Sequence, residues 1–431
     1  MWLLLLASVH AYAAESLTLP QSIDRALTHN KELKSQKWKT DQAESDRQRV
    51  GAEFGPHIEA LAGIGPITKA IGNAALSTEY KSSYGRMIMG KISVTQPLYA
   101  WGRSARYLDA AQAGIVVEQA AYRQKEEDVR LQVKEAFVGY QLTNSLLDFI
   151  TSAKSDLEKA RADRKNKKGA EKKDDLRLDI FTKEVESREA EVKKNFELAK
   201  EGLSLRLGAE RGSVLPKQVW LLPDSRQKQT VEFYVQKARG QRSEFTQLEQ
   251  GILAKHNLAK AEKLGAFPVL AILGSYEIAN TNVRTPQPGG VFAYDPYNRQ
   301  VWALGVGLKL DLQSNLPFVK AAKYEAEAEE LIAKQDFAQQ GIEIEVRKAY
   351  LDLEEAETRL QATTDAYKIS KKWLTSELIG FSAGLGSSQN LVEAYGARAE
   401  TAKSYFEALY RHYLAWAQLS HAVGQEVDPS F

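Results

Sequence analysis

The stretch Trp302-Ala-Leu-Gly-Val-Gly-Leu-Lys-Leu-Asp311 alternates between two kinds of side chain. Its even-numbered positions, from Trp302 to Leu310, are all apolar, whereas the odd-numbered positions are small or charged. Successive residues of a strand point to opposite faces of a sheet, so this period of two predicts a strand with one wholly apolar face. The same pattern occurs earlier in the chain, from Ile88 to Thr95.

A further candidate strand precedes each of these two. Residues 58–64 and 270–278 alternate in the same way, and Pro56 and Pro268 stand just before them, where a helix would have to end. Polar loops over residues 72–83 and 285–298 join the strands of each pair. The sequence therefore predicts one strand hairpin in each half, at about residues 56–97 and 267–312.

Strands of about 10 residues with one apolar face are typical of outer-membrane barrels. Aromatic residues such as Tyr80, Tyr84 and Trp302 cluster near the strand ends, where the membrane interfaces would lie. Four strands cannot close a barrel, and lipid does not tolerate an open edge, so several copies would have to share one barrel. A soluble sandwich packed on a core remains the alternative. The residues predicted to face lipid are Ile92, Val94, Leu270, Ile272, Trp302, Leu304, Val306 and Leu308.

Two long stretches free of proline, from Leu98 to Leu215 and from Phe318 to Asp428, are rich in helix formers. Within them, apolar residues at 129–150 alternate in steps of four and three, and the pattern returns at 342–363, shifted by 213. This spacing keeps one seam towards a partner helix. Matching segments elsewhere, shifted by 212 to 215, indicate an internal duplication, although an isolated structural coiled coil would give the same periodicity.

The expected domain organisation follows from these patterns. An apolar run over residues 2–9 and a small-residue cleavage pattern at 11–13 indicate a signal peptide over 1–14. The first structural repeat is expected over 15–212 and the second over 231–431, separated by a linker or minimal equatorial region at 213–230. Each repeat should carry a helical hairpin, with tips at about 165–175 and 381–390.

Composition excludes several classes of protein. The 431 residues carry 58 Lys and Arg against 56 Asp and Glu, so a basic nucleic-acid-binding surface is not expected. The mean hydropathy of −0.41 and the lack of a long apolar run argue against a protein with many membrane-spanning helices. The chain has no cysteine, and its six histidines show no metal-ligand spacing. We therefore predict no catalytic residues, no metal site, no cofactor and no enzymatic activity.

Several segments resemble the TolC-like outer-membrane efflux protein family. Leu17–Leu33 is similar to the family's opening helix, and Thr95–Gly102 to its strand-to-helix turn, with Gln96, Pro97, Leu98 and Gly102 as the characteristic residues. Residues 381–394 resemble the second hairpin tip, and residues 203–208 and 419–424 the ends of the two return helices. The resemblance covers essentially the whole mature chain. It implies an α+β membrane protein with a long coiled-coil α-helical barrel and a β-barrel shared between protomers, four strands per chain.

The resemblance also implies a function. The protein would be a homotrimer in the cell outer membrane, in contact with outer-membrane lipid, with a periplasmic helical extension. It would act as the passive exit duct of a tripartite efflux or type I secretion system, with a periplasmic adaptor protein and an inner-membrane transporter as partners. The alternative is a periplasmic adaptor or a coiled-coil scaffold protein of an envelope complex.

In this family the hairpin tips close the tunnel entrance and dock the adaptor. The first tip departs from the family pattern because it is strongly basic, and three copies would form a positive collar. A solvated run of charge at a helix end is the simpler alternative. The residues implied for docking are Lys167, Lys168, Gly169, Asp174, Asp175, Gly384, Leu385, Gly386 and Ser387.

Overall fold

The computed structural model describes residues 15–73, 77–165, 172–223, 226–284, 297–310, 315–383 and 385–427. The described chain is mostly helical, with one four-stranded sheet and one pair of short strands. It forms two compact units, one from residues up to 38, 119–246 and 335 onward, the other from 39–118 and 247–334. No described helix is both long enough and apolar enough to span a bilayer.

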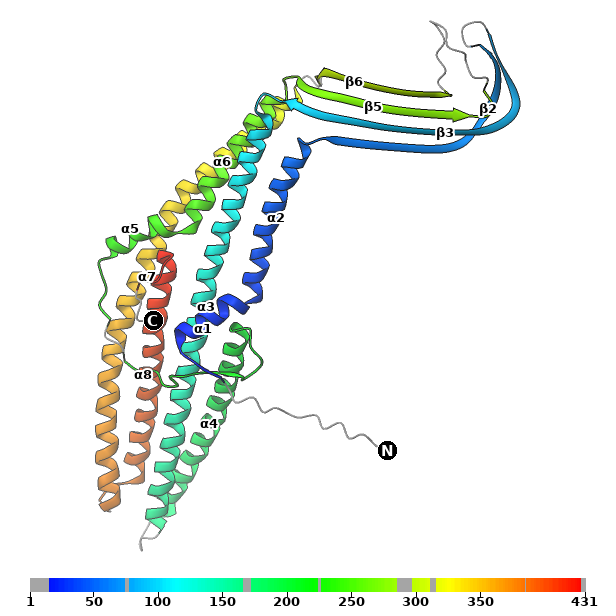
Figure 1. Ribbon diagram of the computed structural model, residues 1–431. Coiled ribbons are helices and arrows are strands. Elements are labelled where there is room, and N and C mark those ends of the chain that lie inside the picture. Colours follow the sequence, from blue (N-terminus) through cyan, green and yellow to red (C-terminus); the bar gives the residue numbers. More distant parts are fainter. Residues whose placement is uncertain are drawn as a thin grey trace, which may run out of the picture. The chain divides into compact units, whose positions relative to one another are not determined.

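The two halves of the chain contain the same order of elements (Figure 1). The first half has α1 (Leu19–His29), α2 (Lys31–Glu53), β2 (His57–Asn73), β3 (Ser77–Tyr99), α3 (Arg103–Lys165) and α4 (Lys172–Arg206). The second half has α5 (Val231–Gln241), α6 (Ser243–Leu264), β5 (Val269–Thr281), β6 (Arg299–Lys309), α7 (Leu316–Ala383) and α8 (Ser388–Val423). Two short strands, β1 (Glu15–Leu17) and β4 (Val214–Pro216), complete the set.

Equivalent residues begin the first helix of each half. Thr18 caps α1 by accepting a hydrogen bond from the Gln21 N–H, and the Thr18 N–H donates to the side-chain oxygen of Gln21, which completes a capping box. Thr230, 212 positions later, caps α5 in the same way through the Phe233 N–H. Both helices contain only 11 residues, because each ends at a residue with extended backbone before the next helix begins.

The seam predicted from the spacing of apolar residues is buried in the first unit. Val129, Val133 and Tyr140 of α3 are at most 3% exposed and pack with residues of α1 and α4. In the second half, Val346 and Leu353 of α7 are fully buried against α5 and α8. Each half thus builds its own core from three helices.

The short parallel pair of β1 and β4 was not expected from the sequence. Glu15, Ser16 and Leu17 lie opposite residues 214–216, and the Lys217 N–H donates to the Leu17 carbonyl at 2.7 Å. Leu17 and Val214 are buried in the core of the first half. The pair therefore fixes the chain segment after the first half to the segment that precedes α1.

The second unit contains an antiparallel sheet in the order β2-β3-β5-β6. The first strand hairpin is longer than expected, because β2 extends to Asn73 and β3 begins at Ser77, within the segment 72–83 that the sequence indicated as a loop. A register shift between Thr68 and Lys69 places two extra residues in β3. The residues at this end of the hairpin, such as Lys69, Asn73 and Ser82, are largely polar, which is why the sequence indicated a loop there.

Candidate functional site

The register of the sheet brings the predicted lipid-facing residues onto one face. Ile92 lies opposite Tyr276, and Tyr276 opposite Trp302; in the same way Val94 and Leu304 flank Gly274. Directly paired residues of neighbouring strands share a face. We call this the apolar face, and it is made by the even-numbered residues of β2, β3, β5 and β6. The full predicted set, Ile92, Val94, Leu270, Ile272, Trp302, Leu304, Val306 and Leu308, lies on it.

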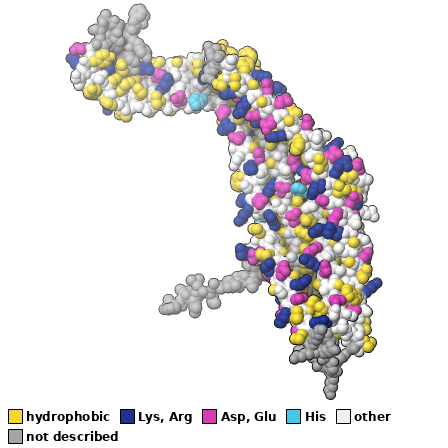
Figure 2. Space-filling view, turned by 180° about the vertical axis from the view of Figure 1, so that it is seen from behind, with side chains coloured by type: hydrophobic (Ala, Val, Ile, Leu, Met, Phe, Trp, Pro, Cys, Tyr) yellow, Lys and Arg dark blue, Asp and Glu magenta, His cyan; other side chains and the backbone are white. Residues whose placement is uncertain are grey.

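The apolar face is largely uncovered along strand β6. Trp302, Leu304, Val306 and Leu308 are 75%, 72%, 67% and 71% exposed. Ile92, in the neighbouring strand pair, is 48% exposed, while Val94, Leu270 and Ile272 are half-buried. Figure 2 shows hydrophobic side chains gathered over the sheet, whereas side chains of both charges are scattered over the helices. Such a contiguous apolar surface indicates contact with another apolar phase or another chain.

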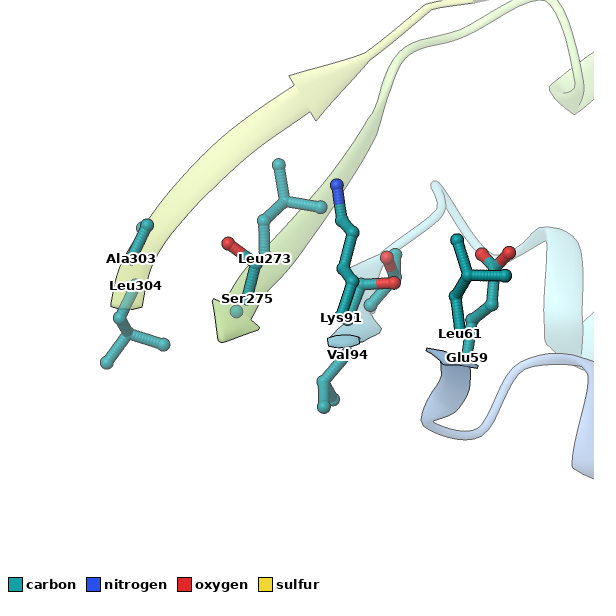
Figure 3. A pocket seen from close by; sticks show the side chains of 12 residues that line it. Glu59, Leu61, Lys91, Val94, Leu273, Ser275, Ala303 and Leu304 are labelled. Carbon is teal, nitrogen blue, oxygen red and sulfur yellow. The ribbon is translucent and has the colours of Figure 1, made fainter. Parts of the chain in front are cut away.

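The opposite face of the sheet, made by odd-numbered residues, carries polar and charged side chains over a shallow hollow of about 560 Å³. In Figure 3, Glu59, Leu61 and Lys91 point to this side, while Val94 and Leu304 point to the other. We call it the hollow face. Lys91 Nζ lies 2.8 Å from Glu277 Oε1, and Arg299 pairs with the second oxygen of the same carboxylate. Three strands are thus joined by one ionic network.

At its far end the hairpin of β2 and β3 bends and is held by the segment that follows β5 (Figure 1). The Ala70 N–H donates to the Val283 carbonyl at 3.2 Å, and Arg284 lies over the rings of Tyr80 and Tyr297 at 5.2 and 4.4 Å. Gly85 is required here, because a Cβ would lie 2.1 Å from Cγ1 of Val283. The segment is therefore fitted closely against the hairpin.

The strand-to-helix turn expected from the sequence joins β3 to α3. Gln96 donates to the Pro97 carbonyl at 2.7 Å, Leu98 is left out of the pairing with β5, and Gly102 has a φ of 80°. Between them, Trp101 has a φ of 55°, which is rare for a side chain of its size. Its indole N–H donates to the Pro268 carbonyl at 2.8 Å. This contact fixes the turn of the first half to the start of β5.

The second hairpin tip is a tight turn between α7 and α8. The N–H groups of Leu385 and Gly386 both donate to the Gly380 carbonyl, at 2.9 and 3.1 Å, and the Ser387 hydroxyl caps α8 by accepting from the Asn390 N–H. A Cβ at Gly386 would lie 2.9 Å from the Phe381 nitrogen. The turn leaves Leu385 90% exposed. Gly384 lies outside the described residues.

Much of the first tip lies outside the part of the chain that the structure describes. This applies to Lys167, Lys168 and Gly169, while positions 174 and 175 belong to helix α4. In the described part of the chain, Leu385, Gly386 and Ser387 are the predicted docking residues that lie together in one turn.

Close to the two tips, the helical hairpins pack on each other. Leu157 and Leu178 of the first hairpin share a buried cluster with Phe381, Leu391 and Tyr395 of the second. Arg177 Nη1 also donates to Gln389 Oε1 at 3.2 Å. Burial raises the pKa of the Tyr395 hydroxyl to about 12, so this group stays neutral at physiological pH.

The ionic network of the hollow face was missed as a functional feature by the sequence analysis. Its signal was available, because Lys91, Glu277 and Arg299 occupy odd-numbered positions of strands whose even positions are mainly apolar. Within the described residues, no group of three or more His, Asp or Glu side chains is arranged to hold a metal ion. The arrangement is that of a surface with two chemically distinct faces.

Residues 22–168 match the family model described as outer membrane efflux protein. No curated protein sequence matches the chain. Several solved structures share its fold. The open state of the Neisseria gonorrhoeae MtrE outer membrane channel has a TM-score of 0.75 at 15% identity and covers 98% of this chain and 94% of that chain. The outer membrane protein VceC from Vibrio cholerae gives 0.74 at 14%, with 95% and 97% covered. A membrane protein from Pseudomonas aeruginosa gives 0.75 at 16%, with 96% and 93% covered.

These matches confirm the resemblance to the outer-membrane efflux proteins and the fold class expected from the sequence. The family description agrees with the expected outer-membrane location and with a role as an efflux channel.

Proposed function

We propose that this chain is an outer membrane efflux protein, and that it is a homotrimer that forms the passive exit duct of a tripartite efflux or type I secretion system. A periplasmic adaptor and an inner-membrane transporter would supply the cargo and the energy, so the chain itself performs no chemical reaction. In this proposal residues 1–14 are a signal peptide, and two repeats, 15–212 and 231–431, flank a short equatorial linker at 213–230.

The observation that carries the proposal is an open sheet with an uncovered apolar face. Strands β2 and β6 form its edges, and neither is paired on its outer side along its length by another described strand. In lipid every backbone polar group must be satisfied, so a membrane-spanning sheet has to close into a barrel. Three copies would supply twelve strands, a number within the range of outer-membrane barrels.

The two faces of the sheet suit this arrangement. The exposed side chains of Trp302, Leu304, Val306 and Leu308 would contact lipid, while the hollow face with Lys91, Glu277 and Arg299 would line the aqueous lumen. Alternation of apolar and polar faces is the pattern of a barrel with a water-filled interior. The tilted strands need about 9–11 residues to cross the membrane, and β6 has 11.

The experiment that tests the channel combines three measurements on protein extracted from the outer membrane in detergent. We expect the mass of a trimer, resistance to extraction without detergent, and stable conductance in a planar bilayer. A soluble monomer, or a particle that does not conduct, would contradict the proposal and favour the adaptor or scaffold alternative.

A pair of variants tests which face meets lipid. Val306→Arg places a charge on the apolar face and is expected to cost about 2–4 kcal/mol of barrel stability near the middle of the membrane. Leu273→Arg places the same charge on the hollow face, at a position that is less exposed (48% against 67% for Val306), and should leave assembly intact while changing ion selectivity. Equal loss of assembled protein in both variants would overturn the assignment of the two faces.

The hairpin tips are proposed to dock the adaptor. Leu385 supports this, because a leucine that is 90% exposed at the end of a rigid turn is suited to insertion into an apolar groove. Leu385→Asp should abolish crosslinking to the adaptor and leave the trimer unchanged. Replacing Lys167, Lys168, Lys172 and Lys173 by Glu tests the basic first tip, and unchanged crosslinking would exclude a role for its charge.

A further inference from the structure

The two edge strands of the sheet carry features that fit each other. We propose that β6 of one copy pairs with β2 of the next, with residues 299–309 opposite residues 57–67, and that Glu59 and Lys309 form an ion pair across this junction. The inference rests on the proposed trimeric channel, and it adds the register in which the copies join.

Backbone geometry determines which residues can pair. Alternate residues of an antiparallel strand direct their N–H and C=O groups to the same edge. In β2 the Ala70 N–H donates to Val283 and not to β3, so the backbone N–H and C=O groups of even-numbered residues point to the open edge. The register shift near Thr68 adds residues to β3 and none to β2, so the same holds for the rest of β2. In β6 the Ala303 carbonyl lies 4.0 Å from the Cβ position of Gly274 in β5, so the backbone groups of odd-numbered residues point to β5. The N–H and C=O groups of the even-numbered residues therefore point to the open edge of β6. Pairing even with even also keeps the apolar face continuous.

The open edge of β2 has a defined end. Pro66 is an even-numbered residue without an N–H, and the N–H of Ala70 is already bonded to Val283. Free pairing is therefore confined to the part of β2 that begins at His57. Residues 57–65, before Pro66, therefore carry the free edge of β2, and in the proposed register they lie opposite residues 301–309 of β6.

The alignment of these edges sets the tilt of the strands in the barrel. Antiparallel pairing of His57 with Lys309 sets Ala60 opposite Val306 and Ala62 opposite Leu304, so that small side chains meet large ones. A row across one copy runs from His57 through Thr95 and Leu273 to Gly305, and Gly305 would then meet Leu61 of the next copy. This shift of four residues per copy corresponds to a strand tilt of about 35°, within the range of outer-membrane barrels.

Charge complementarity supports the same register. Glu59 and Lys309 are both exposed, and neither forms an ion pair with another described residue. Glu59 would lie opposite Gly307, whose missing side chain leaves room for the carboxylate to reach Lys309 two positions along β6. Diagonal neighbours on one face of a sheet are within reach of long side chains. Lys91, Glu277 and Arg299, which also lie on the hollow face, are already engaged with each other.

Cysteine crosslinking reads the register directly, because the chain contains no cysteine. Leu61→Cys combined with Gly305→Cys should give a covalent trimer in denaturing gels after oxidation. Leu61→Cys with Ala303→Cys, or with Gly307→Cys, would crosslink only if the register were shifted by two residues in one direction or the other. These two control pairs should therefore give little covalent trimer. Crosslinking through either control pair, or none in an intact trimer, would overturn the register and leave the channel standing. A monomeric mass would instead contradict the proposed function.

The ion pair is tested by charge reversal. Glu59→Lys and Lys309→Glu should each lower the temperature at which the detergent-solubilised trimer dissociates, and the double variant should recover most of the loss. High salt should reduce the effect of each single variant. If the dissociation temperature of the double variant is lowered by the sum of the two single decreases, the two side chains do not interact.

Discussion

The two halves of the chain hold the same helix break with different chemistry. Between α1 and α2, the Asn30 side chain accepts hydrogen bonds from the N–H groups of Glu32 and Leu33, at 2.8 and 3.2 Å. The equivalent residue between α5 and α6 is Arg242, which pairs with Glu244 and Glu345 and also donates to two carbonyls at the end of α8. The comparison teaches that duplication preserved the backbone geometry, while the side chains diverged from a local cap to a link between three helices.

The largest effect is expected where the second half relies on this buried cation. The Arg242 side chain is only 9% exposed, so Arg242→Ala removes the buried cation that bonds Glu244, Glu345 and two carbonyls of α8. Glu244 keeps a bond from Gln124. We expect a loss of about 3–5 kcal/mol, as for other broken buried ion pairs. Thermal unfolding of the purified protein, followed through its helical circular dichroism, measures the change.

The matched variant in the first half is Asn30→Ala. It removes a neutral cap, and the expected loss is about 1 kcal/mol. Equal losses in the two variants would mean that the extra partners of Arg242 contribute nothing.

An intermediate effect, equal in both halves, is expected at the glycines that end the return helices. Gly208 and Gly424 have φ values of 62° and 76°, and a Cβ would lie 3.0 Å from the His29 carbonyl oxygen or 3.2 Å from Arg242 Cα. Alanine at either position should cost about 1–3 kcal/mol, because both conformation and space favour glycine. The same melting experiment reports it.

Helical glycines in open space provide the controls for that experiment. Gly202 in α4 and Gly396 in α8 have nothing within 4 Å of a Cβ, so alanine there should stabilise the helix by about 0.5–1 kcal/mol. A difference between Gly208→Ala and Gly424→Ala would show that the two helix ends are no longer equivalent.

The smallest effect distinguishes the helical hairpins. In the first hairpin, Lys154 Nζ lies 2.7 Å from Glu189 Oε2, and Lys193 Nζ lies 2.6 Å from Glu189 Oε1. The hydrogen bonds from these two lysines lower the pKa of the Glu189 carboxyl. At the position equivalent to Lys154, the second hairpin has Tyr367, stacked on Tyr405 at 4.8 Å. Stabilisation from a carboxylate with a lowered pKa is complete above its ordinary pKa and is lost as the pH falls through the lowered value. Acid should therefore weaken the contact between Lys154 and Glu189 in the first hairpin, and leave the stacking of Tyr367 on Tyr405 in the second unchanged.

Hydrogen exchange with residue resolution measures that difference. Protection factors of α4 should fall relative to those of α8 between pH 7 and pH 3. In Glu189→Gln the protection of α4 should already be reduced at pH 7 and change less on acidification. Parallel behaviour of the two hairpins in the native protein would contradict the comparison.

The features predicted from the sequence are those that repeat along the chain. The alternation from Trp302 to Leu310 assigns one face of β6. Because residues paired across neighbouring strands lie on the same face, the faces of the other strands follow from the register. The buried seam of Val129 and Val133 followed from its spacing in the same manner. Periodicity reports burial of a whole face, so it works best for long, regular elements.

The features that escaped prediction depend on single contacts between distant residues. Strands β1 and β4 have three residues each, too few to show a period, and pair across about two hundred residues. Arg242 reads as one more surface charge on a helical segment until its partners on α7 and α8 are known. The far end of the first strand hairpin escaped because residues such as Lys69, Asn73 and Ser82 are polar, and a polar segment between strands is typical of a loop.

The pairing of β3 with β5 inside one chain changes the mass action of assembly. A chain with a single repeat would contribute two strands, and six copies would have to meet to make twelve. Because the repeats are fused, β3 finds β5 at the high local concentration that a covalent link provides, whatever the amount of protein in the cell. The concentration dependence of assembly then falls from the sixth to the third power in the proposed trimer. The duplication thus allows the channel to form at expression levels too low for six separate pieces to meet.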